Sequence, residues 1–337
     1  MPPPPGEFDL IARMARILPL RGEGVVLSVG DDAALLRPPA GEVLVATVDE
    51  VVEGVHFDAR FTPADIGWKA MAVNLSDLAA MGARPLWALV ALAFPGETPA
   101  RRILGVMTGL AACSRRHGIA VVGGNVSRGP ALSLAITAVG AVPEGRALTR
   151  SGARAGDLLL GSGVFGDAAL GMLRGAAPAL ARRQRRPTPR LLLGRALAGL
   201  ARAAIDVSDG LVQDLGHMAA ASGVSAVLEA ERIPLSPAYR RRARRLADPL
   251  SAALSGGEDY ELLLAVAPGD LPAARAAARR VRTPLAVLGR FEEGSGVRVV
   301  AGGRPLEVPP GHDHLRAPAP PGPSARRRAT RRAAPPL

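Results

Sequence analysis

The chain of 337 residues is long enough to bury a core in each of two domains. Its formal net charge is +12, and its 48% hydrophobic content suits a compact protein. No apolar run approaches the ~20 residues that span a bilayer, and residues 1–7 lack the basic and apolar regions of a signal peptide. The only cysteine, Cys113, excludes an intrachain disulfide, and we expect it to be a buried structural thiol. A cytoplasmic location fits these observations.

The positive charge raises the question of nucleic-acid binding. Arginine supplies almost all of it, because Lys69 is the only lysine in the chain. We interpret the Arg-rich segments 182–190 and 239–245 as solvated helix faces or loops. The segment 316–337 combines six Arg with many Pro and Ala and no acidic residue, which predicts a disordered tail. Aromatic residues are not interleaved with these arginines, so we expect no specific nucleic-acid partner and no membrane partner, although a weaker role of the tail in nucleic-acid binding stays open.

Hydrophobic periodicity predicts alternating helices and strands in the first 142 residues. One predicted strand runs into Gly30-Asp31-Asp32 and the next runs into Asp49, so both strands end in acidic residues. The predicted elements are a helix at 7–18, strands at 25–29 and 43–48, a helix at 63–81, a strand at 86–93, a helix at 99–117, and strands at 119–122 and 131–142.

A polar, glycine-rich segment at 145–156 marks a domain boundary. We therefore expect an N-terminal domain at 1–148, a C-terminal domain at 149–315 and the tail at 316–337. Strands and helices also alternate in the second domain, which predicts an α/β (α+β) fold class. Its predicted elements are a strand at 157–160, a helix at 167–174, a strand at 203–206, a helix at 211–221, a strand at 225–228, a helix at 237–246, a strand at 260–266, a helix at 271–281, and strands near 285–290 and 296–300.

The segment 161–166 reads GSGVFG and lies between a predicted strand and a predicted helix. This is the GxGxxG pattern of dinucleotide sites, which also need an acidic residue ~20 residues later. That region is RRQRRPTPR here, which argues against a dinucleotide site. We interpret the motif as a tight strand-to-helix turn, and an anion-binding helix N-terminus remains an alternative.

Acidic residues gather in short blocks rich in Gly and Ser, although the chain is strongly basic. Carboxylates on short loops are the ligands that hard cations such as Mg²⁺ require. The blocks lie far apart in the sequence, so only the fold can bring them together. They are Gly30-Asp31-Asp32, Asp49-Glu50 with Glu53, Ser76-Asp77, Asp206-Val207-Ser208-Asp209-Gly210 and Gly256-Gly257-Glu258-Asp259.

Spacing indicates which of these side chains act together. Thr47 and Asp49 are two residues apart on a predicted strand, so they share a face. Asn74 and Asp77 are three apart on a predicted helix and also share a face, where an inward carboxylate needs a partner or a metal ion. Asp209 fits either a metal ligand or the N-cap of the helix that follows it.

Other chemistries fit the sequence poorly. It has no GxSxG nucleophile elbow, no Cys and His spacing typical of zinc sites, no Walker A motif and no protein-kinase signature. Carboxylates on Gly-rich loops favour Mg²⁺ and phosphate instead. The residues therefore indicate a nucleotide-using enzyme of a less common fold.

The blocks resemble the thiamine-monophosphate kinase family, which belongs to the superfamily of aminoimidazole ribonucleotide synthetase. They occur in that family's order and cover most of residues 6–315. The matching segments are GEFDLIAR (6–13), GDDAA (30–34), VDEVVEGVHF (48–57), AVNLSDLAAMGARP (72–85), GGN (123–125), RALTRSGARAGD (146–157), DVSDGL (206–211) and SGGEDYELL (255–263).

The resemblance implies a two-domain, synthetase-like fold. The N-terminal domain would pair its strands with those of a second subunit to form a β-barrel, and the active site would lie in the cleft between this domain and the C-terminal α/β domain. The implied activity is ATP- and Mg²⁺-dependent phosphorylation of thiamine monophosphate to thiamine diphosphate, by direct in-line transfer in a homodimer.

The resemblance also assigns residues to this cleft. Several Mg²⁺ ions would bind Asp32, Thr47, Asp49, Asp77, Asn125, Asp206 and Asp209. ATP would contact Gly124, Asn125, Arg150 and Ser208. Thiamine monophosphate would contact His56, Glu258 and His312. No general base is expected, because the acceptor is already an anionic oxygen.

Three positions depart from the family pattern. Val48 stands where the family has Thr, which would remove a hydroxyl ligand. Asn125 stands where it has Asp, which removes one negative charge from a metal site. His312 precedes Asp-His where the family has an aromatic residue, so its role toward the substrate differs or is weaker.

Two alternatives to this activity remain. A protein that binds ATP or thiamine phosphate without turnover fits the changes at Val48 and Asn125. Another ATP-using member of the superfamily is the second alternative, although the selenophosphate synthetase and hydrogenase-maturation relatives are disfavoured because their terminal cysteines are absent here.

Overall fold

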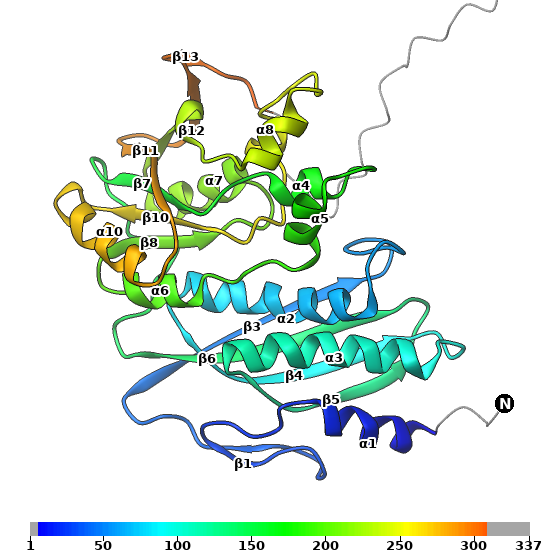
Figure 1. The fold of residues 1–337 in the computed structure, drawn as a ribbon. Helices are drawn as coiled ribbons and strands as arrows, with labels where there is room; N and C mark the ends of the chain where they lie inside the picture. Colours follow the sequence, from blue (N-terminus) through cyan, green and yellow to red (C-terminus); the bar gives the residue numbers. More distant parts are fainter. Residues whose placement is uncertain (1–5, 309–337) are drawn as a thin grey trace, which may run out of the picture.

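The computed structural model describes residues 6–308, which form two α/β units stacked on each other (Figure 1). The predicted α/β fold class is confirmed. The predicted substrate contact His312 and the tail at 316–337 lie outside the described residues. Helix α2 (Pro63–Ala80) runs along the junction, between the N-terminal sheet and α6 (Leu191–Leu197) of the C-terminal unit.

The N-terminal unit is built on a four-stranded sheet in the order β3-β6-β4-β5. Strand β6 pairs antiparallel with β3 and β4, and β4 and β5 are parallel. Helices α2 and α3 pack together, and α1 packs on α3. Besides α2, the elements are α1 (Glu7–Ile17), β1 (Val25–Leu27), β2 (Leu35–Leu36), β3 (Glu42–Val52), β4 (Arg84–Phe94), α3 (Ala100–His117), β5 (Ala120–Arg128) and β6 (Ser133–Pro143).

The start and packing of α2 follow from its sequence. Thr62 and Asp65 form a reciprocal capping box, and Pro63 occupies the first turn, where a missing N–H costs nothing. Glycines then let α2 and α3 approach closely, since a Cβ on Gly67 would lie 1.9 Å from the Val106 carbonyl oxygen. Cys113 of α3 is buried, as expected, and burial raises the pKa of its thiol.

One face of the N-terminal sheet lacks a helix layer among the described residues. Side chains of β3 alternate between the two faces, and its outward set includes Leu44 and Val48. Val48 is 63% exposed, and Leu89 on β4 is 45% exposed. Exposed, contiguous aliphatic residues on a sheet are typical of a surface that a partner covers.

The C-terminal unit is a seven-stranded, mostly antiparallel sheet in the order β13-β12-β9-β11-β7-β10-β8. Its strands are β7 (Leu158–Ser162), β8 (Ala201–Asp206), β9 (Ser225–Glu229), β10 (Leu262–Val266), β11 (Leu285–Glu292), β12 (Gly296–Ala301) and β13 (Arg304–Pro305). Its other helices are α4 (Asp167–Gly171), α5 (Pro178–Arg185), α7 (Leu211–Ser222), η1 (Ala230–Arg232), α8 (Pro237–Ala243), α9 (Ser251–Leu254), η2 (Pro268–Asp270) and α10 (Leu271–Arg280).

The interpretation of residues 182–190 as a solvated segment holds for Arg182 and Arg186, which are exposed, but is wrong for Arg183 and Arg190. Arg183 and Arg190 both form ion pairs with the fully buried carboxylate of Glu261. Burial would raise the pKa of Glu261, but the two guanidinium groups hold it below its ordinary value. Helix α5, which overlaps the start of this segment, and helix α6, which follows it, were not predicted, because three arginines in α5 hid its buried Leu180 and α6 is only seven residues long.

The same segment ties the two units together at α2. Arg186 forms an ion pair with Asp65, and Trp68 donates a hydrogen bond of 3.0 Å to the Pro187 carbonyl. Leu191 and its neighbours on α6 belong to the same buried cluster as the core of the N-terminal unit. The two units therefore share a core along α2, and this shared core fixes the geometry of the junction.

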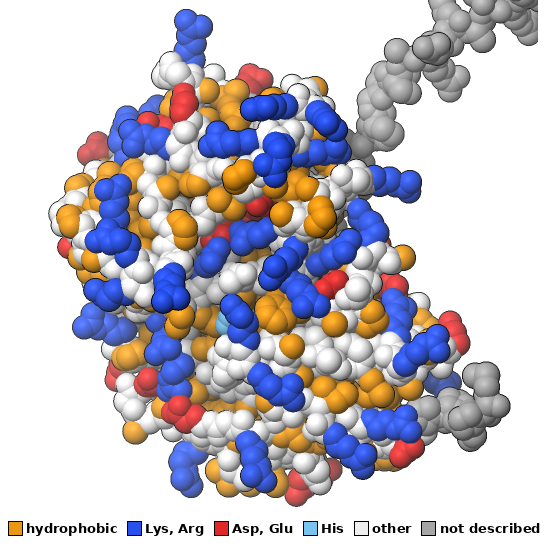
Figure 2. Space-filling view, viewed as in Figure 1, with side chains coloured by type: hydrophobic (Ala, Val, Ile, Leu, Met, Phe, Trp, Pro, Cys, Tyr) orange, Lys and Arg blue, Asp and Glu red, His pale blue; other side chains and the backbone are white. Residues whose placement is uncertain are grey.

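Lys and Arg side chains are spread over the visible face of both units rather than gathered in one patch (Figure 2). No helix within residues 6–308 is long and apolar enough to cross a membrane. The expectation of no specific nucleic-acid partner stays a prediction.

Candidate functional site

Two predicted pairs of side chains meet where β3 crosses α2. The Thr47 hydroxyl donates a hydrogen bond of 2.5 Å to Asp77, and the Asn74 side-chain oxygen accepts one of 3.0 Å from the Asp49 backbone N–H. The i, i+2 spacing on the strand and the i, i+3 spacing on the helix put each pair on one face, and these hydrogen bonds show that the two faces meet. The carboxylates of Asp49 and Asp77 form the N-terminal half of the candidate site.

The C-terminal unit adds a third carboxylate at the end of β8. Ser76 on α2 donates a hydrogen bond of 2.7 Å to Asp206, which is buried. The chain then turns through the loop 206–210, where the backbone N–H groups of Ser208, Asp209 and Gly210 all donate to one oxygen of Asp214. Asp214 lies in the first turn of α7 and holds this loop in shape.

The structure rules out one of the two roles considered for Asp209. The N-cap of α7 is Gly210, and no side chain caps the helix there. The N-cap interpretation of Asp209 is therefore wrong. Its carboxylate raises the pKa of Asp49, which shows that it is close to the acidic cluster.

These buried carboxylates lie together without enough positive charge nearby, and their pKa values are raised. Burial, then Asp77 and Asp209, raise the pKa of Asp49 to about 6. Burial and Asp77 raise that of Asp206 to about 8, and burial raises that of Asp77, with Arg150 acting in the opposite direction. Buried acids that repel one another are stabilised by a bound cation.

The carboxylates do not by themselves complete a metal site. Within residues 6–308, no three Asp, Glu, His or Cys side chains are placed to hold one ion. Hydroxyl and amide oxygens of Thr47 and Asn74 lie beside them, and Mg²⁺ usually takes only one or two carboxylates together with water and phosphate oxygens. The cluster therefore fits ions that arrive with phosphate groups.

A second polar group lies further along α2. The Lys69 ammonium is buried, forms an ion pair with Glu258, and donates a hydrogen bond of 2.8 Å to the His56 carbonyl. Burial lowers the pKa of Lys69, and the Glu258 carboxylate acts in the opposite direction. Lys69 thus brings together His56 and Glu258, the two predicted substrate contacts in the described range.

The loop that carries Glu258 runs beside the loop 206–210. The Glu258 N–H donates to the Ser208 carbonyl at 2.8 Å, and the Tyr260 backbone N–H donates to the Val207 carbonyl at 2.8 Å. Glu258 and Tyr260 both have positive φ, 68° and 51°, which is strained for residues other than glycine. Such strain often accompanies a functional site.

The GxGxxG motif forms a tight turn, as interpreted. Gly163 and Gly166 adopt positive φ of 58° and 78°. The carboxylate of Asp259 accepts hydrogen bonds from the N–H groups of Gly166, at 2.7 Å, and Ala168, at 3.5 Å. The anion at the start of α4 is therefore the protein's own carboxylate, so the alternative of an external anion at this helix is wrong.

Other predicted ligands lie on the opposite, open face of the N-terminal sheet. Asn125 on β5 pairs with Ala91 on β4, and both are exposed there. Gly124, Asn125 and Asp32 line a cavity of about 1050 Å³ around the edge strand β5. The structure thus divides the predicted metal and ATP residues between two faces of one sheet.

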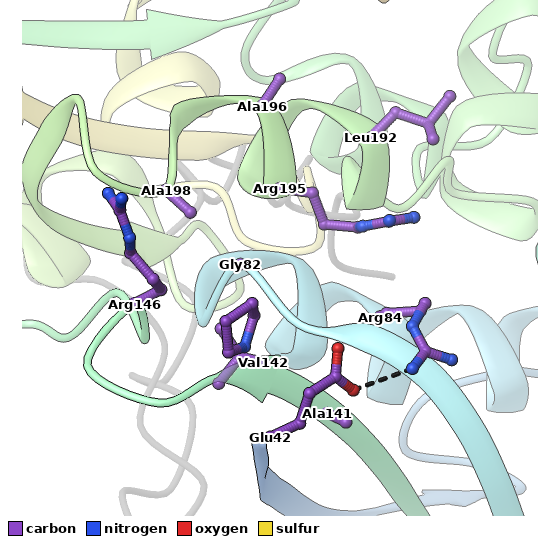
Figure 3. A pocket seen from close by; sticks show the side chains of 11 residues that line it. Glu42, Gly82, Arg84, Ala141, Val142, Arg146, Leu192, Arg195, Ala196 and Ala198 are labelled. Carbon is purple, nitrogen blue, oxygen red and sulfur yellow. Dashed lines mark hydrogen bonds and ion pairs between the residues drawn. The ribbon is translucent and has the colours of Figure 1, made fainter. Parts of the chain in front are cut away.

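A smaller cavity of about 510 Å³ lies at the junction below α6 (Figure 3). Arg195 lines it from α6, and Arg84 and Glu42, which form an ion pair, line it from the N-terminal sheet (Figure 3). No predicted site residue of the described range borders this cavity. It is therefore separate from the candidate site.

The sequence matches two models of AIR synthase related proteins, the N-terminal domain over residues 30–142 and the C-terminal domain over residues 154–302. A thiamine-monophosphate kinase of Salmonella typhimurium is 39% identical over 325 residues, which cover 93% of this chain and 99% of the relative. The chain belongs to the thiamine-monophosphate kinase family. The kinase of Haemophilus influenzae is 37% identical over 92% of this chain and 98% of the relative.

Solved structures of the family have the same fold. The thiamine-monophosphate kinase of Stenotrophomonas maltophilia K279a, 43% identical, superposes with a TM-score of 0.80 over 89% of this chain and 98% of that one. A structure of AaThiL complexed with AMPPCP and TMP, 33% identical, has a TM-score of 0.73 over 92% and 97% of the two chains. The predicted family and two-domain, synthetase-like fold are confirmed, and pairing of strands across a dimer stays a prediction.

Contrary to expectation, Val48, which stands where the family has Thr, does not remove a hydroxyl ligand from the carboxylate cluster. The Val48 side chain points to the open face of β3, away from the face that carries Thr47 and Asp49. A hydroxyl at position 48 would therefore not join the Asp77 and Asp206 carboxylates of the same chain, and its loss as a ligand of that cluster is not supported.

The structure adds polar residues that the sequence reasoning missed. Ser76 and Tyr260 stand within two residues of a predicted ligand in the chain, whereas Gln184 has no such neighbour. Burial raises the pKa of Tyr260, and the charges of Glu258 and Asp49 act in the same direction. The missed residues are Lys69, Ser76, Gln184, Asp214 and Tyr260.

Proposed function

We propose that this chain transfers the γ-phosphoryl group of ATP to thiamine monophosphate and forms thiamine diphosphate. The observation that carries the proposal is the meeting of Asp49 and Asp77 of one unit with Asp206 of the other, across the Ser76 hydrogen bond. Relatives of this sequence are thiamine-monophosphate kinases, and the related AaThiL structure holds AMPPCP, an ATP analogue, together with TMP.

The charges of the substrates explain why such a cluster is needed. ATP and a phosphate monoester together carry roughly five or six negative charges, which must be neutralised before the two can approach. Mg²⁺ bound to the carboxylates supplies this neutralisation. The acceptor is already an anionic oxygen, so the protein needs no general base and acts by positioning and electrostatics.

The residues present fit several Mg²⁺ ions. Burial raises the pKa values of Asp49, Asp77 and Asp206, and repulsion by neighbouring carboxylates adds to it at Asp49 and Asp206, so each gains from a nearby cation. We assign the metal ions to Asp32, Thr47, Asp49, Asp77, Asn125, Asp206 and Asp209. Asn125 supplies an uncharged oxygen, so the ion it contacts depends more on phosphate oxygens than in relatives with Asp.

The nucleotide and the acceptor occupy different parts of the cleft in this proposal. Arg150 lies close enough to Asp77 to lower its pKa, which suits a contact with ATP phosphates beside the metal ions. We assign ATP to Gly124, Asn125, Arg150 and Ser208. We assign thiamine monophosphate to His56 and Glu258, with His312 completing the acceptor site from outside the described residues.

A homodimer accounts for the open face of the N-terminal sheet. Covering Val48 and Leu89 with a second copy would bury exposed aliphatic surface. It would also enclose the cavity that holds Asp32 and Asn125. The domain limits 1–148 and 149–315 and a cytoplasmic location remain part of the proposal.

The test is direct. Purified protein is incubated with ATP, thiamine monophosphate and Mg²⁺, and the products are separated by chromatography. The proposal expects thiamine diphosphate and ADP in equal amounts, and their loss when EDTA is added. Binding of both substrates without any diphosphate above a protein-free control would instead favour the non-catalytic alternative.

A further inference from the structure

One stripe of α2 carries the polar contacts to the C-terminal unit. Asp65, Lys69 and Ser76 are spaced i, i+4 and i+11, so they lie within about 40° of one another around the helix. Each is bonded across the junction, to Arg186, Glu258 and Asp206 respectively. The stripe therefore links the Glu258 group and the carboxylate cluster through one rigid helix.

Lys69 is the buried member of this stripe. Its side chain is 1% exposed, and its ammonium contacts the Glu258 carboxylate, the His56 carbonyl and the face of Phe61 at 5.5 Å. It is the only lysine among 42 Lys and Arg residues. A compact ammonium fits this enclosed position, whereas the planar guanidinium of the arginines used elsewhere is larger and needs a wider site.

Glu258 is held by three neighbouring residues, and its side chain is still partly exposed. Its N–H is bonded to the Ser208 carbonyl, and its second carboxylate oxygen accepts a hydrogen bond of 3.3 Å from Gln184. The Glu258 side chain is 17% exposed, while that of its partner Lys69 is 1% exposed. Lys69 therefore does not face a ligand itself and acts on one through Glu258.

We propose that Lys69 is a positioning residue that fixes Glu258 at a set distance from the carboxylate cluster and so determines which acceptor fits. Seven residues of helix separate Lys69 from Ser76, a rise of about 10 Å. The acceptor that fits this spacing has a phosphate at one end, for the cations that Asp77 and Asp206 would hold, and hydrogen-bond donors at the other, for Glu258. The inference rests on the proposed function, in which the aminopyrimidine of thiamine monophosphate supplies those donors.

The test compares acceptors and nucleotide in matched variants. Lys69→Met leaves a buried carboxylate unpaired, so the double variant Lys69→Met/Glu258→Gln provides a form without that penalty. We expect both variants to raise the KM for thiamine monophosphate by ~10-fold or more, which is the effect of losing one hydrogen bond to a charged group. The KM for ATP should change by less than about two-fold. Arg202→Met, which breaks the ion pair with buried Asp157 away from the cleft, is the matched control and leaves both values unchanged.

A truncated acceptor separates positioning from general destabilisation. The thiazole phosphate portion of the substrate lacks the aminopyrimidine, so its KM is high with the unmodified protein and equally high with Lys69→Met. Lys69→Arg keeps the positive charge, but the guanidinium is larger than the enclosed position. We expect its KM for thiamine monophosphate to lie between those of the unmodified protein and Lys69→Met. Glu258→Gln and the double variant should have the same acceptor KM, because Lys69 acts only through Glu258.

Different results overturn different statements. An unmodified protein that forms no thiamine diphosphate overturns the proposed function itself. An active protein whose Lys69→Met and double variants keep the normal acceptor KM overturns only the role of Lys69. Equal increases in the KM of ATP, of the full acceptor and of the thiazole phosphate also overturn it, because they indicate a general loss of structure.

Discussion

Ser76 of the N-terminal unit donates a 2.7 Å hydrogen bond to Asp206 of the C-terminal unit, with both side chains buried at the junction. This contact brings the end of β8 to the carboxylates of Asp49 and Asp77 on the other unit. The acidic cluster consequently depends on how the two units dock along α2, and a change in that docking would separate its halves.

Replacing Asp77 with Asn is expected to lower kcat by ~100-fold or more. The site would lose a negative charge that holds a cation beside the phosphoryl groups. The amide can still accept the Thr47 hydrogen bond, so the fold should persist. Steady-state rates and thermal melting of the variant test this directly. Asp248→Asn, at an exposed loop position, serves as the control. Normal turnover in Asp77→Asn would show that Asp77 is not a metal ligand.

Local spacing predicted much of this cluster and could not predict the rest. Thr47 with Asp49 and Asn74 with Asp77 follow from the periods of a strand and a helix, and both pairs were found together. The contact of Asp206 with Ser76 joins residues 130 positions apart, and no local pattern encodes such a distance. Only the family resemblance placed Asp206 in the same site.

The sequence also could not predict which lysine and arginine side chains are buried. Arg183 and Arg190 stand in a run that looks solvated, yet they neutralise buried Glu261. Whether a charged residue faces water or a buried partner depends on tertiary packing that composition does not record. The single Lys69 was visible in the sequence, but its ion pair with Glu258, 189 residues away, was not.

The acidic cluster should make the metal-free protein less stable as the pH rises. Asp206 and Asp214 have pKa values raised to about 8 and about 7, so the folded protein binds more protons than the unfolded chain, and stability is lost as the pH rises through these values. Each extra proton bound by the folded protein changes the free energy of unfolding by about 1.4 kcal/mol per pH unit. The opposite contribution of His117, whose pKa is lowered to about 4 by burial, fades across the window from pH 6.5 to 8, because the unfolded histidine loses its proton there.

Urea unfolding with EDTA across this window measures the effect. The free energy of unfolding should fall toward pH 8, and Asp206→Asn should reduce the slope because it removes one linked proton. Saturating Mg²⁺ should restore more stability at pH 8 than at pH 6.5, since the ion competes with protons for the same carboxylates. A flat profile without metal would contradict the raised pKa values.

Asp214 should be required for the shape of the loop 206–210. Asp214→Ala leaves three backbone N–H groups without their acceptor, and we expect a loss of about 1–3 kcal/mol in unfolding free energy together with much lower activity. Asp214→Asn keeps one acceptor oxygen in the same place and should retain most of the stability. Calorimetry and rate measurements on the two variants distinguish them. Equal stability of the alanine and asparagine variants would show that the oxygen does not hold the loop.

A charge on the open face of the N-terminal sheet should disrupt the proposed dimer. Val48→Glu and Leu89→Glu place carboxylates where aliphatic side chains are exposed, so the fold of one chain should be unaffected, while an interface that buries these positions would lose a charge to an apolar environment. Light scattering after size-exclusion chromatography should give the mass of two chains for the unmodified protein and of one for the variants. The variants should also lose activity if the cavity of Asp32 and Asn125 is completed by the second copy. A monomeric and fully active unmodified protein would rule out both the dimer and this role for it.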